Sequence, residues 1–272
     1  MTLEKIGIVG FGVVGKAAER TFSKFYQTVV YDKYQDYDKF ESLLSCDFVI
    51  IMVPTPFNCK ENTVDDSALV SNLNRLNSLN FDKPVIVKST LPPGKCELYS
   101  QKFNLEIVYN PEFLRESTTP YEDFENQDVI VIGTDSSSTF KLVKTMYEKV
   151  AIPDARYYHL TSKEAEMVKC AQNTMLASRV ALANMIYDAC KSNDIEYAKV
   201  KKIAFDNFEI IGPFMTQVPG PDGHRGFGGK CLPKDIRAFS TVHKSKLLDE
   251  IINYNDKLRD DLGKVLDDYE ST

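Results

Sequence analysis

The feature that most constrains this fold is a group of glycines that directly follows a short apolar run near the start of the chain. The run, residues 5–10, leads into six residues that match GxGxxG: Gly10-Phe11-Gly12-Val13-Val14-Gly15. A segment with helical spacing comes next, and a second apolar run over residues 29–31 ends in Asp32. This order predicts a strand, a glycine turn, a helix and a second parallel strand, the βαβ unit that binds dinucleotides.

Four more short apolar runs follow at residues 48–53, 85–88, 106–109 and 129–133. Each is too short for a helix and is bounded by Pro, Gly, Asn or Asp. Because the runs are continuous rather than alternating, they predict a parallel sheet that is buried on both faces. We therefore expect a Rossmann-like α/β domain over residues 1–157.

The pattern changes after about residue 155. Residues 161–193 contain no Gly or Pro and carry apolar residues at helical spacing, which predicts one long helix. Thr161 and Glu164 form a capping box at its start. A Gly/Pro-rich loop follows over residues 212–229, and the chain then reads as helical from 234 to about 265. We expect an α-helical dimerisation domain over residues 158–272, built around this long central helix.

The glycine motif and Asp32 together predict an NAD site. Gly10 permits the tight turn, Gly12 lets the pyrophosphate approach the helix N-terminus, and Gly15 lets helix and strand pack closely. The Asp32 carboxylate suits the adenosine ribose hydroxyls and repels a 2′-phosphate, so NAD is favoured over NADP. The alternatives are a FAD site or the turn of an α/β domain that binds no nucleotide.

Composition excludes several classes of function. Thirty-nine acidic and 33 basic residues give a net charge of −6, so a nucleic-acid partner is not expected. No apolar run reaches membrane length and no secretory start is present. Six cysteines without a CxxC pair predict free thiols in a reducing, cytoplasmic compartment. Three histidines fall outside metal-ligand spacing, so we expect no metal site.

The most informative stretch is a glycine-rich turn that leads into a helix: Gly226-Phe227-Gly228-Gly229-Lys230-Cys231-Leu232-Pro233-Lys234-Asp235. Cys231 precedes the predicted helix start, with a lysine on each side. Positive charge and a helix N-terminus favour the thiolate that a nucleophilic cysteine requires. Asp235, four residues on, could orient a water molecule. The alternative for a single cysteine is a buried apolar side chain.

Polar residues on the long helix and at two strand ends are further candidates for the functional site. Lys169 and Asn173 are one helical turn apart, so they share a face and could hold an oxyanion; otherwise they belong to a solvated face. Glu112 and Glu116 follow a strand end, where open α/β sheets bind ligands, although they could simply cap a helix. Thr90 belongs to a hydroxyl-bearing segment, residues 88–94, at another strand end.

Together these segments resemble the UDP-glucose/GDP-mannose dehydrogenase family, in particular its UDP-glucose 6-dehydrogenases. The resemblance rests on residues 10–15, 53–56, 88–94, 110–116 and 226–235, with Lys169 and Asn173 at the family spacing. It implies that a nucleotide sugar's C6 alcohol is oxidised to the acid in two NAD-dependent steps, with a covalent thioester in the second. The base and hexose of the substrate stay open.

The resemblance also implies a role for each matching residue. Cys231 would be the nucleophile, Lys169 and Asn173 would stabilise the C6 oxygen, and Glu112 would be the base for thioester hydrolysis. Thr90 and Asp235 would position the water, and Thr55, Thr90 and Glu116 would lie at the NAD site. Family contacts to the sugar and phosphates fall on Phe113, Leu114, Arg115, Gly228 and Lys234.

The sequence departs from the family pattern in two places. Where the family has Arg-Ile-Gly, with the arginine contributed across the dimer interface, this chain reads Ile210-Ile211-Gly212. We propose that Arg225 substitutes. Family members also continue into another α/β domain that encloses the nucleotide, whereas this sequence stops at Thr272. From this we expect an open site that binds the nucleotide end weakly or with a separate protein.

Two other classes of function stay open. A β-hydroxyacid dehydrogenase shares the Rossmann domain and the Lys-x-x-x-Asn helix but needs no cysteine, and a non-catalytic nucleotide-binding or regulatory homologue would explain the missing arginine.

Apolar residues on more than one face of the long helix predict a homodimer, since one face can cover the sheet and another needs a partner.

Overall fold

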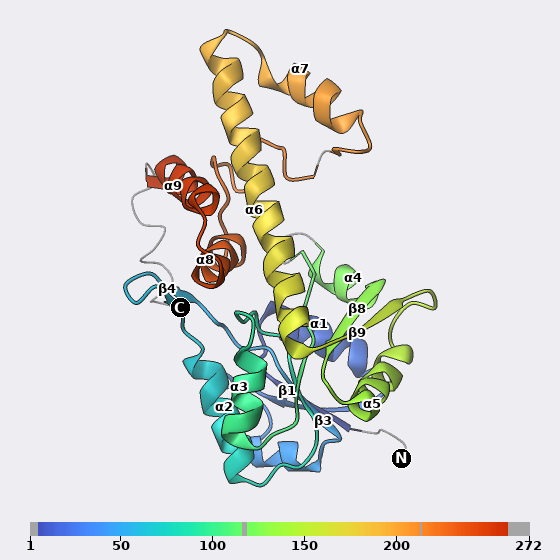
Figure 1. The fold of residues 1–272 in the computed structure, drawn as a ribbon. Helices are drawn as coiled ribbons and strands as arrows, with labels where there is room; N and C mark the ends of the chain where they lie inside the picture. Colours follow the sequence, from blue (N-terminus) through green and yellow to red (C-terminus); the bar gives the residue numbers. More distant parts are fainter. Residues whose placement is uncertain (1–4, 116–118, 213, 261–272) are drawn as a thin grey trace. The chain divides into compact units, whose positions relative to one another are not determined.

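The computed structural model describes residues 5–115, 119–212 and 214–260. The chain divides into two compact units (Figure 1). The first consists of Met1–Thr55 and Val64–Lys169, and the second of Pro56–Thr63 and Cys170–Thr272.

Within the described residues, the first unit is built on a seven-stranded sheet in the order β2-β1-β3-β6-β7-β8-β9. Its strands are β1 Lys5–Val9, β2 Gln27–Tyr31, β3 Phe48–Ile51, β6 Val85–Val87, β7 Ile107–Tyr109, β8 Val129–Gly133 and β9 Arg156–Leu160. All six expected strands are confirmed. The adjacent strands β2, β1, β3, β6 and β7 run parallel to one another. The one difference in direction is at β8, which pairs antiparallel with β7 and parallel with β9.

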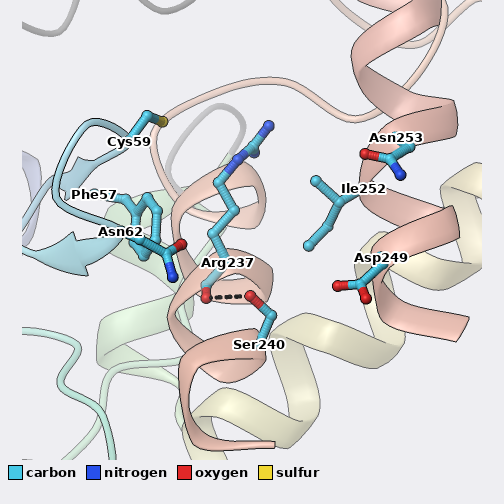
Figure 2. A pocket seen from close by; sticks show the side chains of 8 residues that line it. All are labelled: Phe57, Cys59, Asn62, Arg237, Ser240, Asp249, Ile252 and Asn253. Atoms are coloured by element: carbon cyan, nitrogen blue, oxygen red, sulfur yellow. Dashed lines mark hydrogen bonds between the residues drawn. The ribbon is translucent and has the colours of Figure 1, made fainter. Parts of the chain in front are cut away.

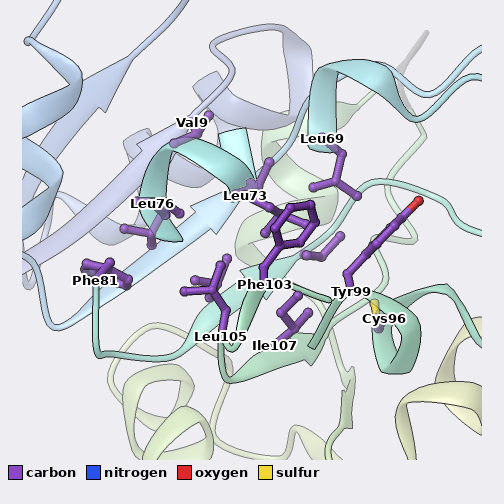
Figure 3. Packing of buried hydrophobic residues seen from close by; sticks show 14 of the residues in the cluster. Val9, Leu69, Leu73, Leu76, Phe81, Cys96, Tyr99, Phe103, Leu105 and Ile107 are labelled. Carbon is purple, nitrogen blue, oxygen red and sulfur yellow. The ribbon is translucent and has the colours of Figure 1, made fainter. Parts of the chain in front are cut away.

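Helices cover both faces of this sheet, as the continuous apolar runs predicted. In β3, Phe48 and Ile50 belong to the apolar cluster on one face, while Val49 and Ile51 belong to the cluster on the other. The first face is covered by α1 Val13–Phe22, α4 Pro120–Glu125 and α5 Ser137–Glu148. The second is covered by the 3₁₀ helix Phe40–Ser45, α2 Ser67–Ser78 and α3 Lys95–Phe103 (Figure 3). Burial of one aliphatic side chain of these clusters contributes about 1.5–3 kcal/mol to the free energy of unfolding.

The predicted long helix is α6, Ser162–Ser192, and it runs through the division between the two units. Its capping box is confirmed: the Thr161 amide donates to Glu164 Oε2 at 2.9 Å, and the Glu164 amide donates to Thr161 Oγ1 at 3.3 Å. In the first turns, buried Glu166 accepts hydrogen bonds from the amides of Gly94 and Cys96 at the start of α3. The sequence thus determines where α6 begins, and Glu166 fixes that end to the first unit.

The second unit is mainly helical, with α7 Tyr197–Lys201, a π-helix Lys202–Asp206, α8 Leu232–Val242 and α9 Lys246–Asp260. A short pairing joins β4 Phe57–Asn58 to β5 Thr63–Val64. The core of the second unit is the cluster of Ala177, Ala181, Phe227, Ile236 and Leu248. None of the helices within residues 5–115, 119–212 and 214–260 is long and apolar enough to cross a membrane.

The expectation of one helical stretch from 234 to 265 is corrected. His243 takes an extended backbone (φ −134°, ψ 111°), so α8 ends there, and the Asp249 amide donates to Ser245 O at the start of α9. The break lets α9 turn back and bury Leu248 in the cluster that contains Ile236 of α8. Residues 261–265 lie outside the described residues.

Candidate active site

Many of the predicted site residues of the first unit lie at one edge of its sheet. Gly10, Asp32, Thr55, Thr90 and Glu112 follow the carboxyl ends of β1, β2, β3, β6 and β7. These strands are parallel neighbours, so their carboxyl ends meet at the same edge. Ligands of open α/β sheets bind at this edge.

The glycine turn fits a dinucleotide diphosphate. Gly10 has a φ of +90°, and a Cβ there would lie 2.5 Å from the Met52 carbonyl oxygen. A Cβ at Gly12 would instead meet no atom within 4 Å. Gly12 is also the N-cap of α1 and makes no side-chain cap. The turn therefore leaves open space beside a helix N-terminus, where backbone amides and the helix dipole favour a diphosphate.

Asp32 ties the glycine turn to the end of β2. Its Oδ2 accepts a hydrogen bond from the Phe11 amide at 2.8 Å, and its Oδ1 accepts one from the Tyr34 amide at 2.9 Å. The carboxylate is half-buried. Each oxygen retains a lone pair for a ribose hydroxyl, since an ionised carboxylate has about four acceptor sites.

Hydroxyl groups connect the loops after β3 and β6. Thr55 is buried and its Oγ1 donates to the Thr90 carbonyl at 2.8 Å. Ser89 Oγ donates to the Val53 carbonyl at 2.7 Å and accepts from the Val53 amide at 3.0 Å. The predicted residues Thr55 and Thr90 are thus brought together, and Ser89 is an additional link between the loops.

Glu112 follows β7 and caps no helix. Its Oε1 accepts hydrogen bonds from the amides of Phe113 at 2.9 Å and Leu114 at 3.1 Å. Its Oε2 lies 3.1 Å from Lys88 Nζ, and both side chains are buried. The sequence pointed to Glu112 as a base, but its pairing with Lys88 depends on the register of β6 against β7.

The residues after Glu112 have different surroundings. Phe113 and Leu114 are half-buried, and Lys169 Nζ of α6 lies 5.4 Å from the Phe113 ring centroid. Arg115 binds Asp123 with two side-chain hydrogen bonds, Nε to Oδ2 at 2.8 Å and Nη2 to Oδ1 at 2.6 Å. Bonding to Arg115 lowers the pKa of Asp123 to about 2, against the opposing effect of burial. Glu116 lies outside the described residues.

In the second unit, Cys231 is exposed at the N-cap of α8. One turn into this helix, the fully buried Asp235 accepts a hydrogen bond from Asn173 Nδ2 and one from Lys234 Nζ, the latter at 2.5 Å. The structure therefore brings together Asn173, Lys234 and Asp235. Asp235 fixes the direction of the Asn173 amide, a contact that sequence spacing alone did not indicate.

The six cysteines are free, and their surroundings differ. Burial raises the pKa of Cys46 to about 11 and holds the pKa of Cys96 well above its usual range. Those thiols stay protonated at neutral pH. Cys231 is instead exposed, at the N-terminal end of an 11-residue helix.

Two residues of α9 hold the glycine turn before Cys231, and sequence reasoning missed both. Asn255 accepts a hydrogen bond from the Phe227 amide at 2.6 Å and donates to the Phe227 carbonyl at 3.1 Å. Arg259 donates to the Gly226 carbonyl at 2.7 Å, and a Cβ at Gly228 would lie 2.8 Å from its guanidinium. The close approach at Gly228 is thus to a side chain of this same protein, and a larger residue there would displace the Arg259 guanidinium.

Arg225, on the same turn, has partners on α6. Its Nη2 lies 2.6 Å from Asp188 Oδ2, its Nε donates to Asn184 Oδ1 at 3.3 Å, and its guanidinium stacks over Tyr187. Pairing with Asp188 raises the pKa of Arg225, although burial opposes this.

A cavity of about 420 Å³ in the second unit lies beside α8 and α9. Figure 2 shows the residues that line it: Phe57, Cys59, Asn62, Arg237, Ser240, Asp249, Ile252 and Asn253. Arg237 donates to the Pro233 carbonyl at 3.0 Å and to Asp256 at 2.5 Å, so it joins α8 to α9. In the part of the chain that the structure describes, no group of three or more His, Cys, Asp and Glu side chains could hold a metal ion.

Comparison with known proteins gives a consistent result. Residues 16–151 match the UDP-glucose/GDP-mannose dehydrogenase family's NAD binding domain, and residues 163–257 match its central domain. UDP-glucose 6-dehydrogenase of Campylobacter jejuni is 31% identical over 200 residues, covering 72% of this chain and 49% of that protein. The chain thus spans about half the length of the curated relatives it matches.

Solved structures share the fold. A UDP-glucose dehydrogenase from Pyrobaculum islandicum superposes with a TM-score of 0.80 at 24% identity, covering 96% of this chain and 68% of that one. A 3-hydroxyisobutyrate dehydrogenase from Mycobacterium tuberculosis superposes with a TM-score of 0.72 at 14% identity, covering 96% and 95%. The domain matches indicate NAD as the cofactor of the first unit. They show that this chain belongs to the UDP-glucose/GDP-mannose dehydrogenase family.

Proposed function

We propose that this protein is an NAD-dependent nucleotide-sugar 6-dehydrogenase that oxidises UDP-glucose, or a related UDP- or GDP-sugar, to the uronic acid. The observation that carries the proposal is the exposed Cys231 at the start of α8, with Asp235 buried one turn later between Asn173 and Lys234. A nucleophilic thiol at the start of a helix, one turn before a carboxylate that holds an amide and an ammonium, is suited to acyl chemistry.

The reaction needs a hydride acceptor, a covalent hold on the aldehyde and a means to activate water. NAD, when bound, accepts one hydride in each of the two oxidations. In our proposal the Cys231 thiolate attacks the C6 aldehyde to give the alkoxide of a thiohemiacetal, and loss of hydride from that carbon leaves a thioester. Water then attacks the thioester carbon, the thiolate leaves, and the carboxylate of Glu112 accepts the water proton.

The remaining site residues take supporting roles. Lys169 and Asn173, one turn apart on α6, would hold the negative charge on the C6 oxygen. Thr90 and Asp235 would position the water, the latter through Asn173 and Lys234. Glu116 and Thr55 would lie at the cofactor. We assign sugar and phosphate contacts to the following residues: Phe113, Leu114, Arg115, Gly228, Lys234 and, in place of the family arginine, Arg225.

The test is NADH production with UDP-glucose, GDP-mannose and UDP-N-acetyl sugars. We expect two NADH per sugar from one of them. A β-hydroxyacid dehydrogenase forms one NADH per substrate and needs no cysteine, so one NADH, unaffected by Cys231→Ser, would favour that class. NAD binding without turnover of any sugar would favour a non-catalytic nucleotide-binding or regulatory homologue.

The six free thiols support a reducing compartment such as the cytoplasm.

Asp32 is expected to discriminate between NAD and NADP. In Asp32→Asn the negative charge that repels a 2′-phosphate is lost, while an oxygen remains to accept from a loop amide. The ratio of kcat/KM with NAD to kcat/KM with NADP should fall at least about tenfold, which corresponds to about 1.4 kcal/mol. Asp36→Asn, in an exposed position of the following loop, is the control. An unchanged ratio in Asp32→Asn would contradict the assignment.

The exposed apolar side chains of α6 support a homodimer. Met175, Leu182 and Met185 are 64%, 53% and 52% exposed. A partner helix would remove this surface from water, at about 25 cal/mol per Å². We expect sedimentation equilibrium to give a dimer at micromolar concentration, and Leu182→Glu combined with Met185→Glu to give a monomer. Ser137→Glu on the exposed surface of α5 should remain dimeric. A wild-type monomer would refute the prediction.

A further inference from the structure

Lys88 is a buried cation for which the proposed reaction has no use. It directly follows β6, and its side chain is 1% exposed. The rings of Phe124 and Tyr147 lie beside it, with centroids 5.4 and 5.7 Å from Nζ. An ammonium in such surroundings is unfavourable unless its charge and its hydrogen bonds are satisfied.

The hydrogen bonds around Lys88 can run in only one direction. Asn110 Nδ2 donates to the Val131 carbonyl at 2.7 Å, so Asn110 Oδ1 must be the acceptor toward its other neighbours. It accepts from Tyr147 Oη at 2.5 Å and from Lys88 Nζ at 2.8 Å. Since the phenol proton is used on Asn110, the phenol oxygen accepts the second bond from Lys88, at 3.2 Å.

The third N–H of Lys88 is left for Glu112 Oε2, 3.1 Å away. A neutral amine has two N–H donors and would turn a lone pair toward the carboxylate, so this arrangement requires an ammonium. Burial alone would lower the pKa of Lys88, but Tyr147 and the Glu112 carboxylate outweigh it and leave that pKa raised.

The two oxygens of Glu112 are held differently. Oε1 accepts from two backbone amides, whereas Oε2 is buried beside the Lys88 ammonium at 3.1 Å and has no other partner among the described residues. Besides Lys88, the titratable groups nearby are the Tyr147 phenol, Lys169 over the Phe113 ring, and Arg115, which is paired with Asp123. Oε2 therefore combines a stabilised negative charge with free lone pairs.

We propose that Lys88 is a positioning residue: its ammonium holds the Glu112 carboxylate in place and leaves Oε2 as the oxygen that accepts the water proton. The inference rests on the proposed function, in which Glu112 is the base. It adds that the base for thioester hydrolysis is held by a buried lysine to which the proposed function gives no contact with substrate or cofactor.

The test is rapid-mixing measurement of NADH in Lys88→Met, which keeps the length of the side chain and removes its charge. The two oxidations do not use Glu112, so a burst of two NADH per active site should form at the wild-type rate. Hydrolysis needs the held carboxylate, so the steady-state kcat should fall at least about tenfold while the thioester accumulates, which the mass of the quenched protein reports. A purely structural defect would slow the burst and the steady state by the same factor.

Tyr26→Phe is the matched control for lost stability. It removes a buried phenol hydroxyl, bonded to the Met146 carbonyl at 3.0 Å, from the apolar cluster that contains Tyr147. It should lower the melting temperature and leave the burst and the steady-state rate unchanged. A Lys88→Met protein with wild-type steady-state turnover, or with the burst and the turnover slowed by the same factor, would overturn the inference.

Glu112→Gln separates this inference from the proposed function. If Glu112→Gln keeps full turnover, the proposed role of Glu112 fails; if Glu112→Gln loses turnover while Lys88→Met keeps the wild-type rate, only the positioning role fails. Should Lys88→Met not fold, thermal unfolding of Lys88→Met/Glu112→Gln decides. A folded double variant supports the ion pair, because removing both charges leaves no buried unpaired carboxylate. A double variant as unstable as the single one overturns it.

Discussion

Replacing Cys231 by serine is expected to lower kcat for conversion of the nucleotide sugar to the uronic acid by at least about 10³-fold. A serine hydroxyl at the start of α8 has no thiolate-like form near neutral pH, so the C6 aldehyde is not held covalently and no thioester forms. The first oxidation does not depend on the thiol, and a single turnover should still yield close to one NADH per active site. Rapid-mixing measurement of NADH, with analysis of the sugar product, checks both parts.

Cys59→Ser is the control for this experiment. Cys59 is also exposed, but it lines the cavity beside α8 and α9 and has no part in the proposed chemistry (Figure 2). Its replacement should leave the stoichiometry at two NADH. If Cys231→Ser also formed two NADH per sugar at the wild-type rate, covalent catalysis through this residue would be ruled out.

Replacing Asp235 by asparagine is expected to lower both stability and turnover. Asp235 is fully buried, and its carboxylate is the partner of the Lys234 ammonium and the Asn173 amide. Removing one member of a buried ion pair leaves the other charge unpaired, which costs about 3–5 kcal/mol. Asparagine has one oxygen for the two donors, so an amide NH2 then faces either Asn173 Nδ2 or Lys234 Nζ, and the Asn173 amide is no longer held in one direction. We therefore expect kcat to fall about 10²-fold, as for loss of an oxyanion donor.

Thermal unfolding and steady-state kinetics measure the two effects separately. Asp249→Asn, an exposed position in the first turn of α9, removes the same charge and should change the melting temperature by a few degrees at most. Asp235→Asn with a wild-type melting temperature and kcat would show that the buried contacts of Asp235 contribute little.

Several elements could be predicted because their causes are local in the sequence. The six expected strands are continuous apolar runs, and the structure buries them on both sides, as such runs require. The start of α6 follows from Thr161 and Glu164, which satisfy each other's backbone amides within one turn. The glycine turn and Asp32 follow from the short spacing of the βαβ unit.

Other features could not be predicted because their causes lie far apart in the chain. The strand β9 carries mostly exposed and half-exposed residues, so it has no apolar run to reveal it. The break between α8 and α9 is favoured by burial of Leu248 in a cluster formed with α6 and α8. Asn255 bonds Phe227 and Arg259 bonds Gly226, which lie 28 and 33 residues earlier in the chain, and nothing in the local sequence of α9 indicates these contacts.

By itself, the sequence determined the βαβ start, the position of the long helix, the residues to which we assign the chemistry and the family to which the chain belongs. Those depend on periodicity and on spacing within a few residues, where the geometry of a strand or helix converts sequence distance directly into spatial distance. Only the tertiary structure decided that Lys88 lies beside Glu112 and that Asp235 lies between Asn173 and Lys234. A buried charge takes its partner from whichever elements the packing brings next to it, and that choice depends on strand register and helix contacts rather than on neighbours in the chain.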